Sequence, residues 1–112
     1  RLCMLINQVF HINMSLSEDL SFKSGSGSLH FKKYYFEEEI EEEKYTLLIN
    51  QHPGGKYLFP EFKNIDYILI ISSGMQRKNF DLKIKKLKEN PGIAAVFKID
   101  PNSVKSFKRL EI

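Results

Sequence analysis

Hydrophobic residues recur along this chain at two spacings, one typical of helices and one typical of strands. The first helical pattern is short and lies at the start of the sequence: Leu2, Leu5, Ile6, Val9 and Phe10. Apolar positions three and four residues apart share one face of a helix, so this spacing predicts an amphipathic helix from residue 1 to about residue 11. We expect its apolar face to pack against a sheet.

A second helical pattern lies in the last third of the chain. Phe80, Ile84 and Leu87 are spaced i, i+4 and i+7, which predicts a helix of about three turns. Asn79 or Asp81 is predicted to cap the start of this helix, and the Pro-Gly pair that follows is predicted to end it.

Four segments combine β-branched and aromatic residues in the way that strands do: 29–38, 45–50, 67–72 and 93–99. Tyr67–Ser72 is apolar up to its last residue, and such runs are typical of central strands that are covered on one face or on both. This segment is therefore predicted to form the middle of the sheet. Ile93–Ile99 alternates with a period of two, which predicts a last strand.

The order of these elements predicts an α+β fold in a single domain, residues 1–112. Strand 67–72, the second helix and strand 93–99 form a β-α-β crossover, which makes the two strands parallel and the connection right-handed. The other strands are expected to be antiparallel, in an open sheet with helices on one face, as in ferredoxin-like folds. The β-α-β end is also similar to ligand-sensing domains of the ACT type.

Turn-forming and charged residues separate the predicted strands. Ser24–Ser28 and His52–Gly55 are rich in Gly, Ser or Pro and predict turns. Glu37–Glu43 holds glutamate at every position except Ile40. Because these like charges would repel one another if they were packed, this segment is predicted to be a solvated hairpin tip.

Composition indicates an ordinary globular chain from a reducing compartment. Hydrophobic residues make up 42% and charged residues 28% of the sequence, which disfavours disordered and fibrous classes. Cys3 is the single cysteine, so no internal disulfide can form, and its apolar neighbours predict a small buried hydrophobe. No apolar run reaches the roughly 18–20 residues of a membrane helix, so we expect a cytoplasmic protein without membrane contacts.

The net charge of +3 is divided unevenly along the chain. Residues 1–43 carry 4 basic and 8 acidic side chains, a sum of −4, whereas residues 44–112 carry 13 and 6, a sum of +7. The predicted second helix holds four of the lysines: Lys83, Lys85, Lys86 and Lys88. At about 100° per residue they spread over its whole polar face, which favours a solvated surface over an RNA-binding stripe. Together with neighbouring basic residues they could still attract a phosphate backbone.

One segment carries a specific motif: Phe59-Pro60-Glu61-Phe62-Lys63-Asn64-Ile65-Asp66-Tyr67. It resembles the signature of the IPExxxVDY family of Bacteroidota, with Phe in place of the first Ile, Ile in place of Val, and the other four signature residues kept. The opening helix and the segment from Leu87 to Asp100 are similar to the family's pattern as well. The resemblance implies a domain of this size that lacks an N-terminal strand of the family, and it implies no activity.

The residues of the motif are interpreted first as architecture. Pro60 is expected to fix an extended approach to the strand, and Asp66 to close an Asx-type turn just before Tyr67. Glu61 could hold a nearby backbone N–H group or a cation. This structural interpretation is favoured over a binding role for Glu61, Asp66 and Tyr67.

The sequence offers no assembly of residues for catalysis. His11, His30 and His52 lie far apart without the spacing of metal ligands, and the glycines form no phosphate-binding loop. We therefore expect no enzymatic activity, no cofactor and no metal. The leading hypothesis is a binding or adaptor domain with a protein partner. An RNA-associated accessory protein and an ACT-like ligand-sensing domain are the alternatives, and a homodimer is compatible with each.

Overall fold

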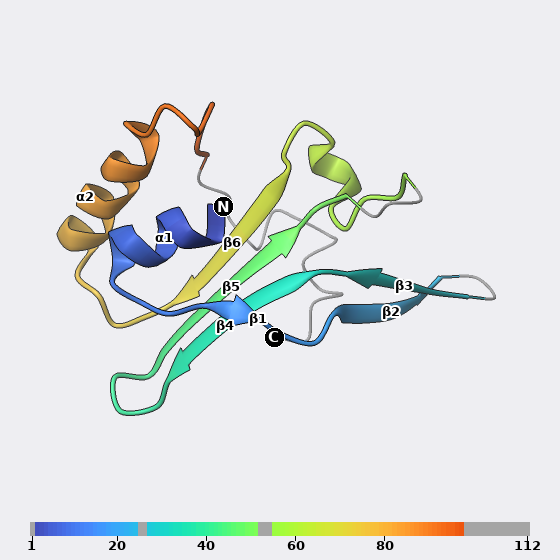
Figure 1. Cartoon of the computed structure of the whole chain (residues 1–112), viewed down its shortest axis with the longest axis horizontal. Coiled ribbons are helices and arrows are strands. Elements are labelled where there is room, and N and C mark those ends of the chain that lie inside the picture. Colours follow the sequence, from blue (N-terminus) through green and yellow to red (C-terminus); the bar gives the residue numbers. More distant parts are fainter. Residues whose placement is uncertain (1, 25–26, 52–54, 98–112) are drawn as a thin grey trace.

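The structure, a computed structural model, describes residues 2–24, 27–51 and 55–97 (Figure 1). Its elements follow in this order: α1 (Leu2–Phe10), β1 (Ser15–Leu16), β2 (Leu20–Ser24), β3 (Gly27–Phe31), β4 (Lys33–Glu38), β5 (Glu43–Ile49), the 3₁₀ helix η1 (Pro60–Phe62), β6 (Tyr67–Ser72) and α2 (Arg77–Lys88). The predicted α+β class is confirmed. In these ranges, neither α-helix has the length and apolar character needed to cross a membrane.

Four strands form an open antiparallel sheet in the order β1-β4-β5-β6. Leu47 in β5 lies opposite Tyr34 in β4 and Leu69 in β6, so β5 is paired on both sides. β2 and β3 form a separate hairpin that projects from the sheet at the right of Figure 1. The helices α1 and α2 lie next to each other at the left of that view.

Alternating side chains of β5 and β6 point to two hydrophobic clusters on opposite faces of the sheet. The helix-side cluster has these buried members: Cys3, Ile6, Phe10, Met14, Tyr45, Leu47 and Leu87. The far-side cluster has these: Phe31, Leu48, Leu58, Phe59 and Ile68. The prediction that the apolar face of the first helix packs on a sheet is therefore confirmed.

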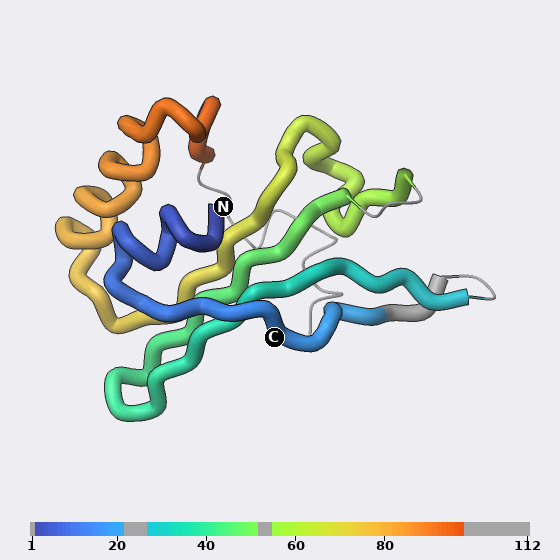
Figure 2. Tube along the Cα trace, viewed as in Figure 1, coloured from blue at the N-terminus to red at the C-terminus, as the bar shows by residue number. Residues whose placement is uncertain are grey.

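The segment 29–38, predicted as one strand, is divided into β3 and β4. Figure 2 shows one extended run of backbone through both strands, but the pairing partner changes at Lys32. Phe31 lies opposite Leu20 of β2, whereas Lys33 lies opposite Leu48 of β5. The aromatic residues predict extended backbone correctly, but they do not indicate which neighbour each half will pair with.

The strand predicted to lie in the middle of the sheet lies instead at its edge. β6 has the predicted bounds, Tyr67–Ser72, and among the described strands it pairs with β5 alone. Its apolar residues serve both clusters, since Ile68 belongs to the far-side cluster and Leu69 packs against the helix-side cluster. Coverage of both faces explains the unbroken apolar run, but a strand can be covered on both faces without a paired strand along each of its edges.

The predicted last strand does not form over residues 93–97, so the predicted β-α-β unit is wrong for the described part of the chain. Ile93 and Val96 pack against the helix-side cluster, three residues apart, while Phe97 is 69% exposed. These hydrophobic contacts hold the segment beside the helices without strand pairing. Residues 98 and 99 lie outside the described ranges.

The second helix is confirmed, but its predicted cap is wrong. α2 begins at Arg77, and Gln76 precedes it without a side-chain capping bond, so Asn79 and Asp81 lie inside the helix. The Pro-Gly turn follows the helix as predicted, and the Gly92 N–H donates to Oδ1 of Asn90 at 2.8 Å.

The acidic segment is confirmed as a hairpin tip between β4 and β5. Glu38 lies opposite Glu43, and Ile40 at the apex is 89% exposed. The Glu38 carboxylate accepts the backbone N–H groups of Ile40 and Glu41 at 3.1 and 2.6 Å. The centres of the two other predicted turns, 25–26 and 52–54, lie outside the described residues.

Candidate functional site

A large groove runs along the outer edge of β6. Its volume is about 1010 Å³, and it extends from Asp66 past the whole strand to Arg77 at the start of α2. Both helices and the segment 92–97 contribute to its walls. We call this the edge groove.

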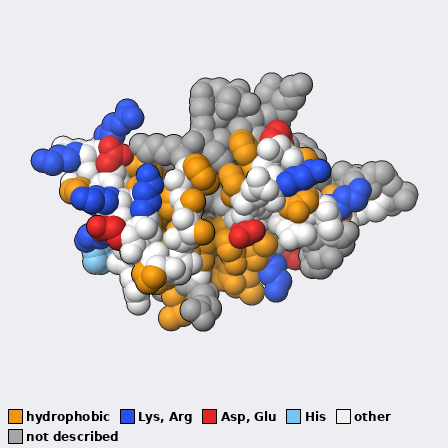
Figure 3. Space-filling model, turned by 90° about the horizontal axis from the view of Figure 1, so that it is seen from above, with side chains coloured by type: hydrophobic (Ala, Val, Ile, Leu, Met, Phe, Trp, Pro, Cys, Tyr) orange, Lys and Arg blue, Asp and Glu red, His pale blue; other side chains and the backbone are white. Residues whose placement is uncertain are grey.

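The edge groove is largely apolar. Ile68 and Ile70 line it from one face of β6, and Leu69 and Ile71 line it from the other, so the groove follows the backbone edge itself. Seen from above, hydrophobic side chains gather in a band at the centre of the molecule, with charged side chains to either side (Figure 3). Exposed apolar patches on soluble proteins are often functional.

The backbone of β6 presents hydrogen-bonding groups to this groove. The Asn50 N–H donates to the Asp66 carbonyl at 2.9 Å, which fixes the phase of pairing between β5 and β6. In antiparallel strands the N–H and C=O groups of successive residues point to alternate sides, so the backbone groups of Asp66, Ile68 and Ile70 point toward β5. The backbone groups of Tyr67, Leu69 and Ile71 therefore point away from β5, and within the described residues they have no strand partner.

The motif enters this edge through a turn that Asn50 holds. Asn50 is fully buried, and its side-chain amide donates to the carbonyls of Phe62 and Ile65 at 2.9 and 2.8 Å. Its Oδ1 accepts the Phe59 N–H at 2.7 Å. Three hydrogen bonds from one buried side chain thus position the whole segment before β6.

Asn50 was not singled out from the sequence. Leu48 and Asn50 are two residues apart, and therefore the amide lies on the same buried face as an apolar residue. A polar residue that continues the apolar side of a predicted strand is the signal that could have identified it. Buried polar groups of this kind are retained only with hydrogen-bond partners.

Asp66 does not close the turn with its side chain. In the described part of the chain its carboxylate has no hydrogen bond, and its backbone carbonyl accepts the Asn50 N–H instead. Pro60 likewise departs from the expected extended approach, because it begins the single 3₁₀ turn η1, where proline suits the first position. Phe59 is buried in the far-side cluster, so this residue of the motif is architectural.

The exposed residues of the motif do not all belong to the groove. Asp66 is exposed, Tyr67 is 43% exposed, and both line the edge groove together with Phe59. Glu61 is exposed on η1, apart from the groove lining. The structure therefore brings Asp66 and Tyr67 together at this surface, whereas Phe59 lines the groove as a buried residue.

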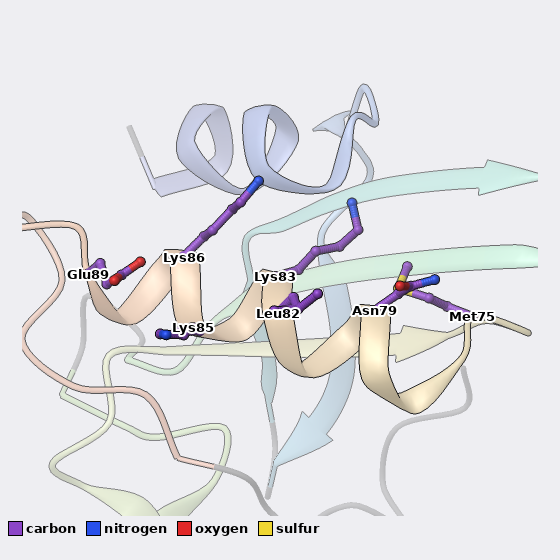
Figure 4. A pocket seen from close by; sticks show the side chains of 7 residues that line it. All are labelled: Met75, Asn79, Leu82, Lys83, Lys85, Lys86 and Glu89. Atoms are coloured by element: carbon purple, nitrogen blue, oxygen red, sulfur yellow. The ribbon is translucent and has the colours of Figure 1, made fainter.

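The four lysines of α2 do not form one basic stripe. Lys83 donates from Nζ to the Val9 carbonyl at 3.2 Å and lies 5.6 Å from the centre of the Phe10 ring, so it joins α2 to α1. Figure 4 shows Lys83 and Lys86 directed toward α1, and Lys85 directed away from it. Among the described residues, the adjoining depression of about 570 Å³ is lined by residues 75–89 alone, and it is a strip of the α2 surface.

Two further candidates from the sequence are a metal site and the single cysteine. No three His, Cys, Asp or Glu side chains gather there in a way that could hold a metal ion. Cys3 is buried, as predicted, and its Sγ donates to the Met14 carbonyl at 3.6 Å. Burial raises the pKa of the Cys3 thiol, which keeps it protonated and unreactive.

Comparison of the sequence with models of protein families found no match, and searches among curated proteins and solved structures found none either.

Proposed function

We propose that this chain is a non-catalytic binding domain that acts through protein–protein contacts, and that the edge groove is its binding surface. The observation that carries this proposal is the nature of β6. The strand contains no charged residue and no proline, although it lies at an edge of the sheet that the described strands form. Proteins protect exposed edge strands with charges, proline or a covering segment, because a bare edge pairs with other chains.

The shape and chemistry of the groove favour an extended protein segment. A strand added to β6 would gain backbone hydrogen bonds from Tyr67, Leu69 and Ile71, and its apolar side chains would contact both faces of the sheet. The groove lining is apolar around these groups, with Asp66 near one end and Arg77 near the other.

The RNA-binding alternative has weaker support. A phosphate-binding surface needs several cations that are free to face the backbone of a nucleic acid. Lys83 already contacts Val9 and Phe10, and Lys85 and Lys86 point in different directions. The ACT-like alternative rested on a last strand, and residues 93–97 do not form one.

Photo-crosslinking from two positions tests the proposal. Tyr67 is replaced by p-benzoylphenylalanine to place the probe in the edge groove, and Lys85 is replaced in a matched variant to place it on the outer surface of α2. After irradiation in cells, we expect a nuclease-resistant protein adduct from position 67 and none from position 85. Nuclease-sensitive adducts from position 85 alone would contradict the proposal and favour RNA.

A further inference from the structure

We propose that the partner in the edge groove is a second copy of this chain, paired through antiparallel alignment of the two β6 strands about a twofold axis at Leu69. The inference rests on the proposed function of the edge groove and identifies its occupant. Three properties of β6 carry it: the positions of its outward backbone groups, the order of its side chains and the charges beyond its two ends.

The outward backbone groups of β6 are complementary to themselves. The backbone groups of Tyr67, Leu69 and Ile71 point away from β5, to the edge where no described strand pairs with them, and Leu69 is the central residue of the three. A twofold axis at Leu69 pairs Leu69 with its own copy and Tyr67 with Ile71 of the other chain. All three N–H and all three C=O groups of each strand are then bonded. If the register of the two strands is shifted by two residues in either direction, some of these N–H and C=O groups no longer lie opposite a residue of the other β6.

The same alignment places like side chains opposite one another. Ile68 of one copy lies opposite Ile70 of the other on one face, and Tyr67 lies opposite Ile71 on the other face. Cross-strand pairs of apolar and aromatic residues stabilise a sheet. Asp66 lies opposite Ser72, whose hydroxyl is able to donate to a carboxylate. No apolar side chain is set against a charged one.

The charges beyond the strand favour the antiparallel direction. Asp66 precedes β6, whereas Arg77 begins α2 after its other end, and both line the edge groove. Antiparallel pairing brings the acidic end of each copy toward the basic end of the other. Parallel pairing would bring like charges together at both ends.

Sedimentation velocity and multi-angle light scattering measure the predicted state directly. We expect the full chain to show twice the 13.1 kDa mass of one copy and to dissociate on dilution. Leu69→Pro removes the N–H on the axis, while the groups that face β5 stay in place, because proline is tolerated on the outer side of an edge strand. This variant should be folded by circular dichroism and monomeric.

Disulfide trapping tests the register. Residues that form a hydrogen-bonded antiparallel pair have Cα atoms about 5.5 Å apart, within the range of a disulfide. In a Cys3→Ala background, Leu69→Cys should therefore give a covalent dimer on mild oxidation. Tyr67→Cys is the matched control and should stay monomeric on a reducing-agent-free gel, because position 67 faces position 71. The combined Tyr67→Cys and Ile71→Cys variant should trap the dimer again.

Exchange of charge tests the direction of pairing. Asp66→Arg alone should weaken the dimer about threefold to fivefold at low salt, and Asp66→Arg with Arg77→Asp should restore it. Rescue by the second exchange is an outcome that a loss of folding cannot produce.

Two results would overturn the inference. A chain that stays monomeric at all concentrations up to about 1 mM has no such dimer, and a dimer that Leu69→Cys does not trap uses another surface or register. If the chain is monomeric while position 67 still crosslinks to a different protein, the inference fails and the proposed function stands. If neither adduct nor dimer is found, both fail.

Discussion

Asn50 takes the role in the turn that the sequence suggested for Asp66. An aspartate next to an apolar strand is a reasonable turn former, because its carboxylate can accept a nearby backbone N–H. The structure instead places the buried amide of Asn50 at the centre of the turn, with bonds to Phe59, Phe62 and Ile65. Asp66 is left exposed at the groove.

We predict that Asn50→Ala lowers the free energy of unfolding by about 3 kcal/mol, because it leaves buried backbone groups without their partners. Asn64→Ala, in the same turn but exposed, is the matched control and should change it by less than about 0.5 kcal/mol. Asp66→Ala should resemble the control. Urea unfolding followed by circular dichroism measures the free energy of unfolding of all three variants. A large decrease for Asp66→Ala would show that its side chain has a structural role after all.

Cys3 provides a test of the packing of α1. Because burial raises the pKa of its thiol, we expect Ellman's reagent at pH 8 to label the folded chain at least about tenfold more slowly than the chain in guanidinium chloride. The unfolded thiol ionises first as the pH rises, so stability should fall above about pH 8.5 and be unaffected by this group below it. Cys3→Ser, which does not ionise, should remove that part of the pH dependence. Rapid labelling of the folded chain would show that α1 does not bury this side.

At the scale of the elements, spacing and composition predict what forms but not what it pairs with. The two helices and the strands at 45–50 and 67–72 follow from local periodicity, which depends on nearby residues only. The edge position of β6, the division at Lys32 and the lack of a strand at 93–97 depend on distant neighbours. The candidate groove was missed for the same reason, since an unbroken apolar strand at an edge looks like a central one.

The end of α1 depends on a contact from α2. Ile12 donates its N–H to the Asn7 carbonyl, and His11 between them has a positive φ of 56°, which is the usual geometry after a helix. Lys83 adds a cation at this end, where carbonyls and the helix dipole favour positive charge.

We therefore predict that Lys83→Met costs about 1 kcal/mol of stability, through loss of the hydrogen bond and of the contact with the Phe10 ring. Lys85→Met, on the same helix but exposed, should cost less than about 0.3 kcal/mol. Thermal unfolding at low and high salt distinguishes the two variants, because the stability loss of Lys83→Met should persist in part at high salt. Equal effects of both variants would show that Lys83 is merely a surface charge.

At the scale of the whole molecule, the sheet separates two hydrophobic clusters. The helix-side cluster contains Ile6 and the far-side cluster contains Ile68, with no shared buried member. Stability is therefore expected to divide between the clusters.

We predict that Ile6→Val and Ile68→Val each cost about 1 kcal/mol and that the double variant costs the sum within about 0.5 kcal/mol. Residues that do not touch and share no partners contribute independently, whereas neighbours in one cluster do not. Chemical unfolding of the three variants gives the coupling energy. A coupling above about 1 kcal/mol would show that the two faces respond as one core.

The distance along the chain between α1 and its packing partners has a consequence for synthesis on the ribosome. β4, β5 and β6 follow one another in sequence and pair as they emerge, but α1 must wait for Tyr45, Leu47 and finally Leu87. A helix of nine residues is marginal on its own, and translation at about 5–20 residues per second delays its first partners by a few seconds. During that interval the apolar stripe of α1 stays uncovered, which makes this segment the natural site for a ribosome-bound chaperone to engage.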